Sequence, residues 1–439
     1  MFSRTKRPRV LVAAAAIAAS MALLLSACAT ADKPAAGKTT LSFWTWVPTE
    51  QQFADIQAAF EKKYPDITIK WTRTADFADY EKKLQVALAA GDGPDLFGAQ
   101  TGSFLEQYAR FAAPIDKLAD TYSPSWKDKI SANAVAQTTT TKGVVAAMPV
   151  IGAGMEYYLY NKTLLAENGI TELPKTYKDL VAVSAKLKEK GVVSMAMGAK
   201  DTWHDEDFFI WLSQQYGPGS VYKAEDGKLD WTDKTFVDTL TAWKTMFTDG
   251  VFQDGAVGTA TYPDARDNYF YARKSAFFPT GSWHVSAVIP NAETKGTAVE
   301  KDDIGMAMFP QVGPKPEQAT TGVDFALAVN KDSQKKEAAM KFVDFMTLGD
   351  GQQIFVNTLQ GSPVNKDVKV ELAAGASQTA KDSLALITKY NTEAIYSRKL
   401  KYAALDEAIG VALQEVVTGK SVKDALADIQ AASDGITRK

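Results

Sequence analysis

The sequence is poor in cysteine and histidine. Its 439 residues include one cysteine, Cys28, and two histidines, His204 and His284. A single thiol cannot form an internal disulfide, so a hydrophobic core must hold the fold together. Zinc and copper sites usually recruit several His or Cys ligands, which the chain does not offer. We therefore expect no metal and no cofactor.

The chain also lacks an excess of positive charge. The first 27 residues carry four of the 49 Lys and Arg residues and no acidic residue, so the remaining 412 residues hold 45 basic and 52 acidic side chains, a formal charge of −7. Nucleic-acid binding relies on basic patches that displace counterions, so it is not expected. GxSxG, HExxH and phosphate-binding GxxxxGK[ST] motifs are absent from the sequence.

The N-terminal 27 residues have the pattern of an export signal. A basic head within residues 4–9 precedes an apolar run from Val10 to Leu25. A positive head, an apolar run and small residues at the end indicate a secretory signal peptide over residues 1–27. The alternative, a spanning helix, needs about 20 predominantly apolar residues. The polar residues that follow suit a flexible linker, which we expect over residues 28–38.

The one cysteine ends this apolar run, in the sequence LSAC at residues 25–28. This sequence resembles the lipobox of bacterial lipoproteins, in which the cysteine receives a diacylglycerol and the chain is cleaved just before it. The resemblance implies lipidation of Cys28 and a location on the outer face of the cell membrane, since two or more acyl chains anchor a protein stably. The alternative is an incidental free cysteine.

Residues 40–100 alternate between strand and helix patterns. The segments 40–47 and 67–71 have the aromatic content or the two-residue alternation of strands. Apolar residues at helical spacing occupy 53–64 and 80–88, and GDGPDLFGA then predicts a turn and a short strand. This β-α-β-α-β order favours a parallel sheet covered by helices.

The alternation continues along the rest of the chain, which has too many residues for a single small core. Thr176 is expected to cap a helix that Gly191 ends, and apolar stripes predict two helices within residues 405–429. Further strands are expected at VVAAMPVIG, MEYYLYNK, VVSMAMGA, DIGMAMFP and VDFALAVN.

Seven segments, in this order and spacing, resemble the extracellular solute-binding proteins of ABC sugar importers, the family that includes maltose-binding protein. They are TLSFWTW, FEKKYPDITIKW, LAAGDGPDLF, LYNKTLLAENGI, LPKTYKDL, SAFFPTGSW and AVNKDSQKKEAAMKFVDFM. The resemblance implies an α/β chain in the two-lobed, type II periplasmic-binding-protein-like fold, with a ligand cleft between the lobes and C-terminal helices. We expect residues 39–150 and 295–332 in the first lobe, and 151–294 and 333–439 in the second.

The resemblance also implies a function. An exported lipoprotein of this family captures a mono- or oligosaccharide and delivers it to the permease subunits of an ABC importer. It would act as a monomer, anchored to the membrane by its lipid, and it would not be an enzyme.

A sugar site needs aromatic platforms together with carboxylate and amide partners. The positions that match the family's cleft segments supply them, although the family's aromatic residue near Gln100 is missing here. For Trp203 and Trp283 the alternatives are surface packing and core packing. The expected ligand-binding residues are Trp46, Glu50, Asp76, Gln100, Thr101, Asp201, Trp203, Trp283 and Asp324.

Two other functions stay open from the sequence. A binding protein for another solute, such as a polyol phosphate, an amino acid or a peptide, would use Arg266 or Arg398 if that solute were anionic. A secreted glycoside hydrolase would need two carboxylates at a set separation. The acidic run at residues 204–207 is interpreted as a helix N-terminus, where carboxylates meet the positive end of the helix dipole.

Overall fold

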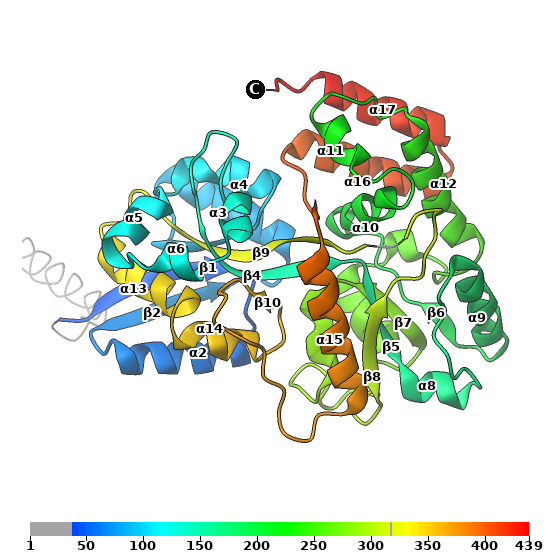
Figure 1. The fold of residues 1–439 in the computed structure, drawn as a ribbon, viewed down its shortest axis with the longest axis horizontal. Helices are drawn as coiled ribbons and strands as arrows, with labels where there is room; N and C mark the ends of the chain where they lie inside the picture. The colour runs from blue at the N-terminus through cyan, green and yellow to red at the C-terminus, as the bar shows by residue number, and fades with distance from the viewer. Residues whose placement is uncertain (1–36, 317, 439) are drawn as a thin grey trace, which may run out of the picture.

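The computed structural model of the protein describes residues 37–316 and 318–438. The predicted signal peptide, residues 1–27, and Cys28 lie outside the described residues. The described residues form two lobes, each built around its own sheet (Figure 1). Within the described ranges, no helix combines the length and the apolar composition that crossing a membrane would require.

The first lobe contains a seven-stranded sheet of order β10-β4-β9-β3-β1-β2, with β11 paired to β9. β1 runs parallel to β2 and β3, whereas β9 is antiparallel to β3 and β4. The strands are β1 (Thr39–Thr45), β2 (Ile67–Arg73), β3 (Leu96–Ala99), β4 (Met148–Met155), β9 (Thr320–Val329), β10 (Ser362–Pro363) and β11 (Tyr396–Ser397). The helices are α2 (Glu50–Lys63), α3 (Phe77–Ala90), α4 (Ser103–Tyr108), η1 (Ala109–Phe111), α5 (Ile115–Tyr122), α6 (Trp126–Lys129), α7 (Ala132–Gln137), α13 (Lys336–Thr347) and α14 (Asp350–Val356).

The second lobe contains a four-stranded sheet of order β6-β7-β5-β8. Its strands are β5 (Tyr157–Asn161), β6 (Val193–Met195), β7 (Ser275–Thr280) and β8 (Ile304–Met308). Its helices are α8 (Lys162–Glu167), α9 (Tyr177–Glu189), α10 (Thr202–Gln214), α11 (Ser220–Glu225), α12 (Lys234–Thr248), η2 (Ala256–Gly258), η3 (Thr261–Phe270), η4 (Ser282–Val288), α15 (Gln378–Glu393), α16 (Ala403–Thr418) and α17 (Val422–Asp434).

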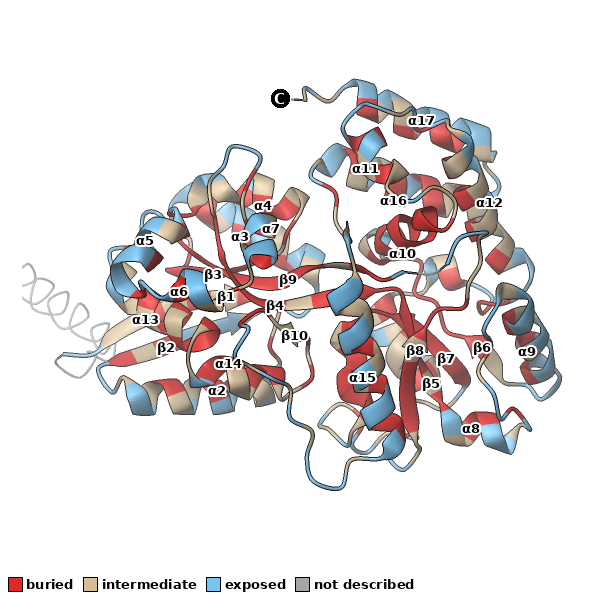
Figure 2. Ribbon diagram, in the orientation of Figure 1, coloured by how far each residue is buried: buried red, intermediate tan, exposed pale blue. Residues whose placement is uncertain are grey.

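The predicted β-α-β-α-β order of residues 40–100 is confirmed as β1-α2-β2-α3-β3. Helix α3 illustrates why the sequence specifies it. The Asp76 carboxylate accepts a hydrogen bond of 2.8 Å from the backbone N–H of Asp79, and Gly91 ends the helix at φ +82°. That conformation strains any residue with a Cβ atom, so glycine is the favoured residue at this position. Figure 2 shows the strands of both sheets buried, while the helices expose one side.

The chain passes between the lobes at several points. Strand β4 of the first sheet is separated from β5 of the second by the single residue Glu156. The chain returns through residues 309–319, between β8 and β9, and crosses again through residues 364–377, between β10 and α15.

The lobe boundaries differ from the expected ones at β8, at the run from α13 through α14 to β10, and at β11, of which β10 and β11 pair with strands of the first-lobe sheet. Strand β8 was expected in the first lobe, but it pairs with β5 in the second sheet. Helix α13 was expected in the second lobe, but Phe342 packs against Phe43 and Phe60 in the first-lobe core, at ring-centre distances of 5.4 and 5.1 Å. A helix that follows a strand packs back onto the same sheet when the connection is short, and the sequence pattern does not identify which sheet that is.

Candidate functional site

The predicted polar residues of the first lobe meet at the edge of its sheet that faces the second lobe. Gln100 and Thr101 follow β3, and Asp324 lies in the adjacent β9. The Gln100 amide donates a hydrogen bond of 2.9 Å to a carboxylate oxygen of Asp324, and the Thr101 hydroxyl donates one of 3.3 Å to the carbonyl of Val323. Ligand sites of α/β proteins lie beyond strand ends of this kind.

The second lobe contributes three aromatic side chains, which we call the aromatic cluster: Trp203, Tyr262 and Trp283. Trp203 lies at the start of α10, and Trp283 follows β7 directly. The ring centres of Trp203 and Trp283 are 6.1 Å apart, and Trp203 stacks on Tyr262 at 6.2 Å. The Trp283 Nε1–H donates a hydrogen bond of 3.0 Å to the Tyr262 hydroxyl, which fixes the orientation of the indole.

Arg398 joins the two lobes, although its position could not be inferred from the sequence. Its guanidinium donates to Asp324 of the first lobe at 2.7 Å and to Asp207 of α10 at 3.0 Å. It also lies over the Trp283 ring, 4.6 Å from the ring centre. Burial alone would lower the pKa of Arg398, but the two carboxylates outweigh burial and the pKa is raised. We call Gln100, Thr101, Asp324, Asp201, Asp207, Arg398 and the aromatic cluster the junction.

Asp201 precedes α10 and shares the second-lobe side of the junction. Burial raises the pKa of its carboxyl, and hydrogen bonds from Thr261 oppose that rise; the Thr261 N–H donates at 2.7 Å. The Asp76 carboxylate of the first lobe raises the pKa of Asp201 further, whereas Lys200 lowers it.

Three predicted residues are not part of this group, and one of them, Asp76, caps α3. Trp46 is only 8 % exposed and packs edge-on against Phe77 and Phe325 in the first-lobe core, at 4.8 and 5.7 Å between ring centres. Glu50 begins α2, is exposed, and forms an ion pair of 3.3 Å with Arg73. Position just after a strand was the reason for both predictions, but the Trp46 ring is large enough to fold back over that strand.

The acidic run at residues 204–207 begins a helix, as expected, but its side chains are buried rather than exposed. Lys399 forms an ion pair of 3.0 Å with Asp207. Burial raises the pKa of the Glu206 and Asp406 carboxyls, which lie beside each other. Burial also raises the pKa of Glu81, on α3, to about 7, and Lys399 opposes that rise. The sequence does indicate that this run is buried. FFIWL follows it directly, and a helix that is apolar on all sides is buried.

Gly102 makes the contact between the lobes unusually close. Its φ of +79° favours glycine. A Cβ atom at this position would lie 2.5 Å from the carbonyl oxygen of Leu400 and 2.7 Å from the Cβ of Lys399. Leu400 belongs to a core cluster of the second lobe, so the backbone of one lobe rests directly on the other.

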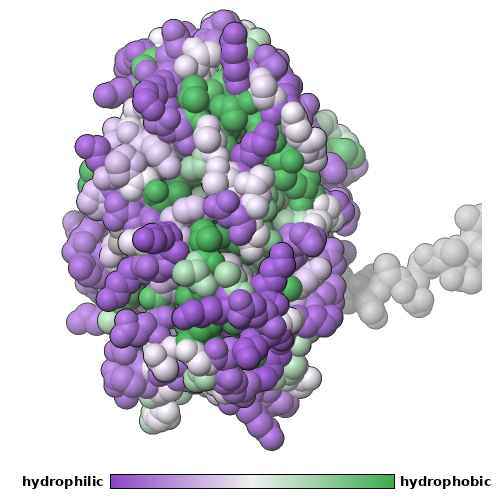
Figure 3. All heavy atoms as spheres, turned by 90° about the vertical axis from the view of Figure 1, so that its right-hand side faces the viewer, coloured by the Kyte–Doolittle hydropathy of each residue, from purple (hydrophilic) through white to green (hydrophobic). Residues whose placement is uncertain are grey.

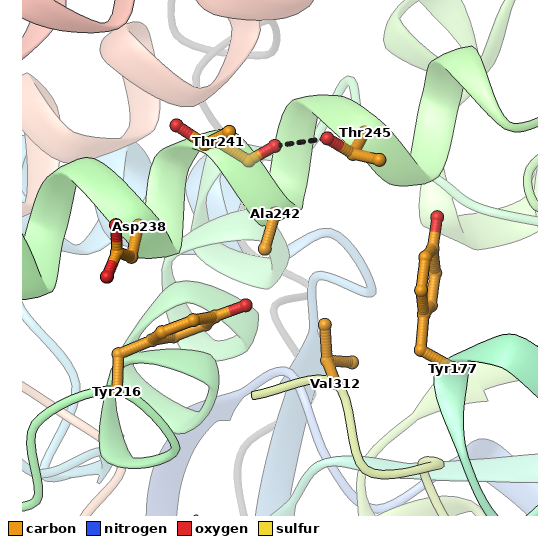
Figure 4. A pocket seen from close by; sticks show the side chains of 7 residues that line it. All are labelled: Tyr177, Tyr216, Asp238, Thr241, Ala242, Thr245 and Val312. Carbon is orange, nitrogen blue, oxygen red and sulfur yellow. Dashed lines mark hydrogen bonds between the residues drawn. The ribbon is translucent and has the colours of Figure 1, made fainter. Parts of the chain in front are cut away.

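Two surface hollows of the second lobe lie outside the junction. One, of about 310 Å³, is lined by α12 and by Tyr177, Tyr216 and Val312 (Figure 4). Its hydroxyls on Thr241 and Thr245 donate to carbonyls of their own helix, so neither is free to donate to a ligand. The other, of about 370 Å³, includes Arg266, Asp267, Tyr271 and Glu293. Figure 3 shows the outer end of this lobe as mostly hydrophilic, with apolar patches between.

No cluster of His, Cys, Asp and Glu in the described ranges could hold a metal ion. The junction instead combines flat aromatic rings with carboxylate and amide groups. Such a set can bind a ligand that has both an apolar face and several hydroxyls.

Comparison with known proteins agrees with the fold. Melibiose/raffinose/stachyose-binding protein MelE of Bacillus subtilis is 24% identical over 349 residues, which is 74% of this chain and 75% of that protein. Maltose-bound MalE3 of T. maritima has a TM-score of 0.74 at 18% identity, over 90% of this chain and 99% of that one. A chitin oligosaccharide binding protein has a TM-score of 0.73 at 20% identity, over 90% and 98%.

These structures are two-lobed binding proteins of the type II class, and they confirm the expected fold class. The model of the family described as bacterial extracellular solute-binding protein matches residues 46–353. Because this match covers well over half of the chain, the protein belongs to the bacterial extracellular solute-binding proteins.

Proposed function

We propose that the protein captures a mono- or oligosaccharide at the junction and delivers it, unchanged, to the permease subunits of an ABC importer. The observation that carries the proposal is the aromatic cluster beside Asp201, Asp324 and Gln100. Family membership supports it, and so do the sugars named for MelE and for the two structural neighbours.

Each part of the junction has a role in this proposal. The C–H face of a pyranose ring stacks on Trp283 or Trp203, because aromatic rings bind apolar faces strongly. The hydroxyls at the rim of the ring donate to the Asp201 and Asp324 carboxylates and accept from the Gln100 amide. These groups perform no covalent chemistry on the ligand.

A saccharide screen tests the proposal. The purified chain without residues 1–27 would be heated with maltotriose, melibiose, xylobiose and chitobiose, and with polyol phosphates, amino acids and short peptides. A bound ligand raises the melting temperature by mass action. Binding of a saccharide supports the proposal, and binding of another solute class alone contradicts it. Chromatography of the ligand after incubation separates a binding protein, which returns it intact, from a glycoside hydrolase.

We further propose that the lobes close around the ligand by rotation at the crossing segments, of which Glu156 is the shortest. A ligand that binds the closed form better shifts the population toward it. Small-angle scattering should give a smaller radius of gyration with the sugar than without it. An unchanged radius at saturating sugar contradicts closure in solution.

The location is proposed from the lipobox at Cys28 and the extracellular family. A protein anchored by acyl chains on Cys28 should be found in the membrane fraction of the cells that express it. Cys28→Ser should remove the lipid and release the protein or leave the signal uncleaved. A Cys28→Ser protein that stays membrane-bound and is processed like its parent contradicts the anchor. We expect the released protein to be a monomer in light scattering.

A further inference from the structure

Arg398 is the most constrained charged side chain at the junction. It is buried, 2.7 Å from an Asp324 oxygen and 3.0 Å from an Asp207 oxygen. Its guanidinium covers one face of Trp283, and the Tyr262 hydroxyl accepts from the indole N–H on the ring edge. Trp283 is itself half-buried, so part of its side chain remains exposed.

The other basic side chains near the aromatic cluster are also matched by acids. Lys399 pairs with Asp207 at 3.0 Å, and Glu206, Glu81 and Asp406 lie around it.

Arg266 lies over the Tyr262 ring, 5.1 Å from its centre, and pairs with Asp267 and with Glu293, the latter at 3.1 Å. Arg398, Lys399 and Arg266 are thus each neutralised by at least one carboxylate within the part of the chain that the structure describes.

Two carboxylates add negative charge where a ligand would bind. Asp201 lies on the second-lobe side, where it accepts a hydrogen bond of 2.7 Å from the Thr261 N–H, and Asp324 lies in β9 on the first-lobe side. Only one oxygen of Asp324 takes part in its bonds with Arg398 and Gln100. An incoming anion would meet these carboxylates while Arg398, Lys399 and Arg266 are already paired with acids, and a desolvated anion without a partner is costly.

We propose that Arg398 is a specificity-determining residue: held by Asp324 and Asp207, it makes the junction selective for uncharged saccharides over anionic ones, such as uronates and sugar phosphates. This inference rests on the proposed function and names the ligand class for it. Discrimination of this kind works by leaving the wrong ligand with an unfavourable charge contact. An unpaired arginine would favour a ligand with a carboxylate. The pairing of Arg398 with Asp324 and Asp207 therefore determines the selectivity.

Isothermal titration calorimetry with two probes tests the selectivity of the parent protein. The probes are the tightest uncharged saccharide of the screen and digalacturonate. Because like-charge contacts cost several kcal/mol, digalacturonate should bind about a hundredfold more weakly or not at all. Equal or tighter binding of digalacturonate overturns the inference and leaves the proposed function standing. If no saccharide of either kind binds, the proposed function itself fails.

Asp324→Asn tests the role of Arg398 directly. The change removes one carboxylate and frees one edge of the guanidinium while keeping a similar shape. Digalacturonate affinity should rise by about tenfold or more, since a charge-assisted contact becomes available, while affinity for the uncharged probe falls. An unchanged ratio between the two probes overturns the role of Arg398.

Asp302→Asn is the matched control. Asp302 also pairs with an arginine, Arg273, at 2.7 Å, and its side chain is nearly as buried as that of Asp324. It belongs to no part of the junction. The Asp302→Asn protein should keep the probe preference of the parent, and a shift equal to that of Asp324→Asn would show that the effect is not specific to Arg398.

Discussion

The two lobes present different chemistry to the junction. The second lobe supplies flat aromatic rings, Trp203, Tyr262 and Trp283, while the first lobe supplies an amide and a carboxylate, Gln100 and Asp324. The first lobe is not short of aromatic residues, but it uses them internally.

Trp46 illustrates this use, because it packs against Phe77, Tyr80 and Phe325 in the core of its lobe. The contrast teaches that a tryptophan's task depends on what surrounds it. The Trp46 indole stabilises the fold, whereas we expect the Trp203 and Trp283 indoles to bind the ligand. Trp211, Trp231 and Trp243 of the second lobe lie in its core.

The largest expected effect in a test of this contrast is the loss of stability caused by replacing Trp46. Trp46→Ala should lower the free energy of unfolding by about 3–5 kcal/mol, because it leaves a cavity among three aromatic rings. Urea denaturation of the ligand-free protein measures it. The affinity for sugar at a temperature where the variant is folded should stay close to that of the parent. A stable Trp46→Ala protein that has lost binding would reverse the assignment of this residue to the core.

Trp283→Ala should have the opposite effects, a loss of sugar affinity with little loss of stability. Truncation of a buried aromatic anchor commonly costs about 2 kcal/mol of binding, which corresponds to roughly thirtyfold in affinity. Trp283→Phe should lose less, because a flat ring remains. Calorimetric affinity and the melting temperature of the empty protein are measured together. If the alanine variant melts far lower yet binds sugar normally when folded, Trp283 belongs to the core like Trp46.

Gln100→Ala tests the polar side of the contrast. The change removes a donor to Asp324 and, by our proposal, a donor to the ligand. A hydrogen bond between neutral groups contributes about 0.5–1.5 kcal/mol, so affinity for the uncharged sugar should fall by up to about tenfold. Calorimetry with the uncharged sugar measures the loss. An unchanged affinity would mean that the first lobe contacts the ligand through other groups.

The smallest effect concerns pH and Glu81, where the first lobe meets Lys399 and Asp406. Burial raises the pKa of Glu81 from 4.5 to about 7 in the folded protein. Below pH 4.5 the carboxyl is protonated in both states and costs nothing. As pH rises to about 7 the unfolded chain ionises first, so the free energy of unfolding falls, by on the order of 1 kcal/mol after allowance for partial exposure.

Glu81→Gln should remove this loss. Urea denaturation at pH 5 and at pH 8 should give a smaller difference between the two pH values for the variant than for the parent. Glu189→Gln, at an exposed position on α9, is the control and should behave like the parent. If both variants keep the full pH dependence, Glu81 is not responsible for it.

Local patterns in the sequence were enough to predict several helices and strands of the fold. The strand predicted from aromatic content at β1, the alternation of β2 and the helical spacing in α2 and α3 are confirmed, and Thr176 caps α9 as expected. These features depend on neighbours in the chain, which a periodic pattern records.

The arrangement of the junction depends on contacts between distant residues, and no local pattern records those. Arg398 lies 74 residues from Asp324 and 191 from Asp207 in the chain, in a segment without periodicity. The sequence prediction assigned β8 and α13 to the wrong lobes for the same reason. Whether each predicted residue touches a ligand stays a prediction.

The close contact at Gly102 has a mechanical consequence. At this contact, where a Cβ atom would lie 2.5 Å from the Leu400 carbonyl oxygen, closer approach is limited by main-chain atoms rather than by adaptable side chains. Main-chain atoms in contact can adapt little, so the closed arrangement of the two lobes should be the same whichever sugar is bound. A permease that senses that position would then receive one signal for every ligand the protein accepts.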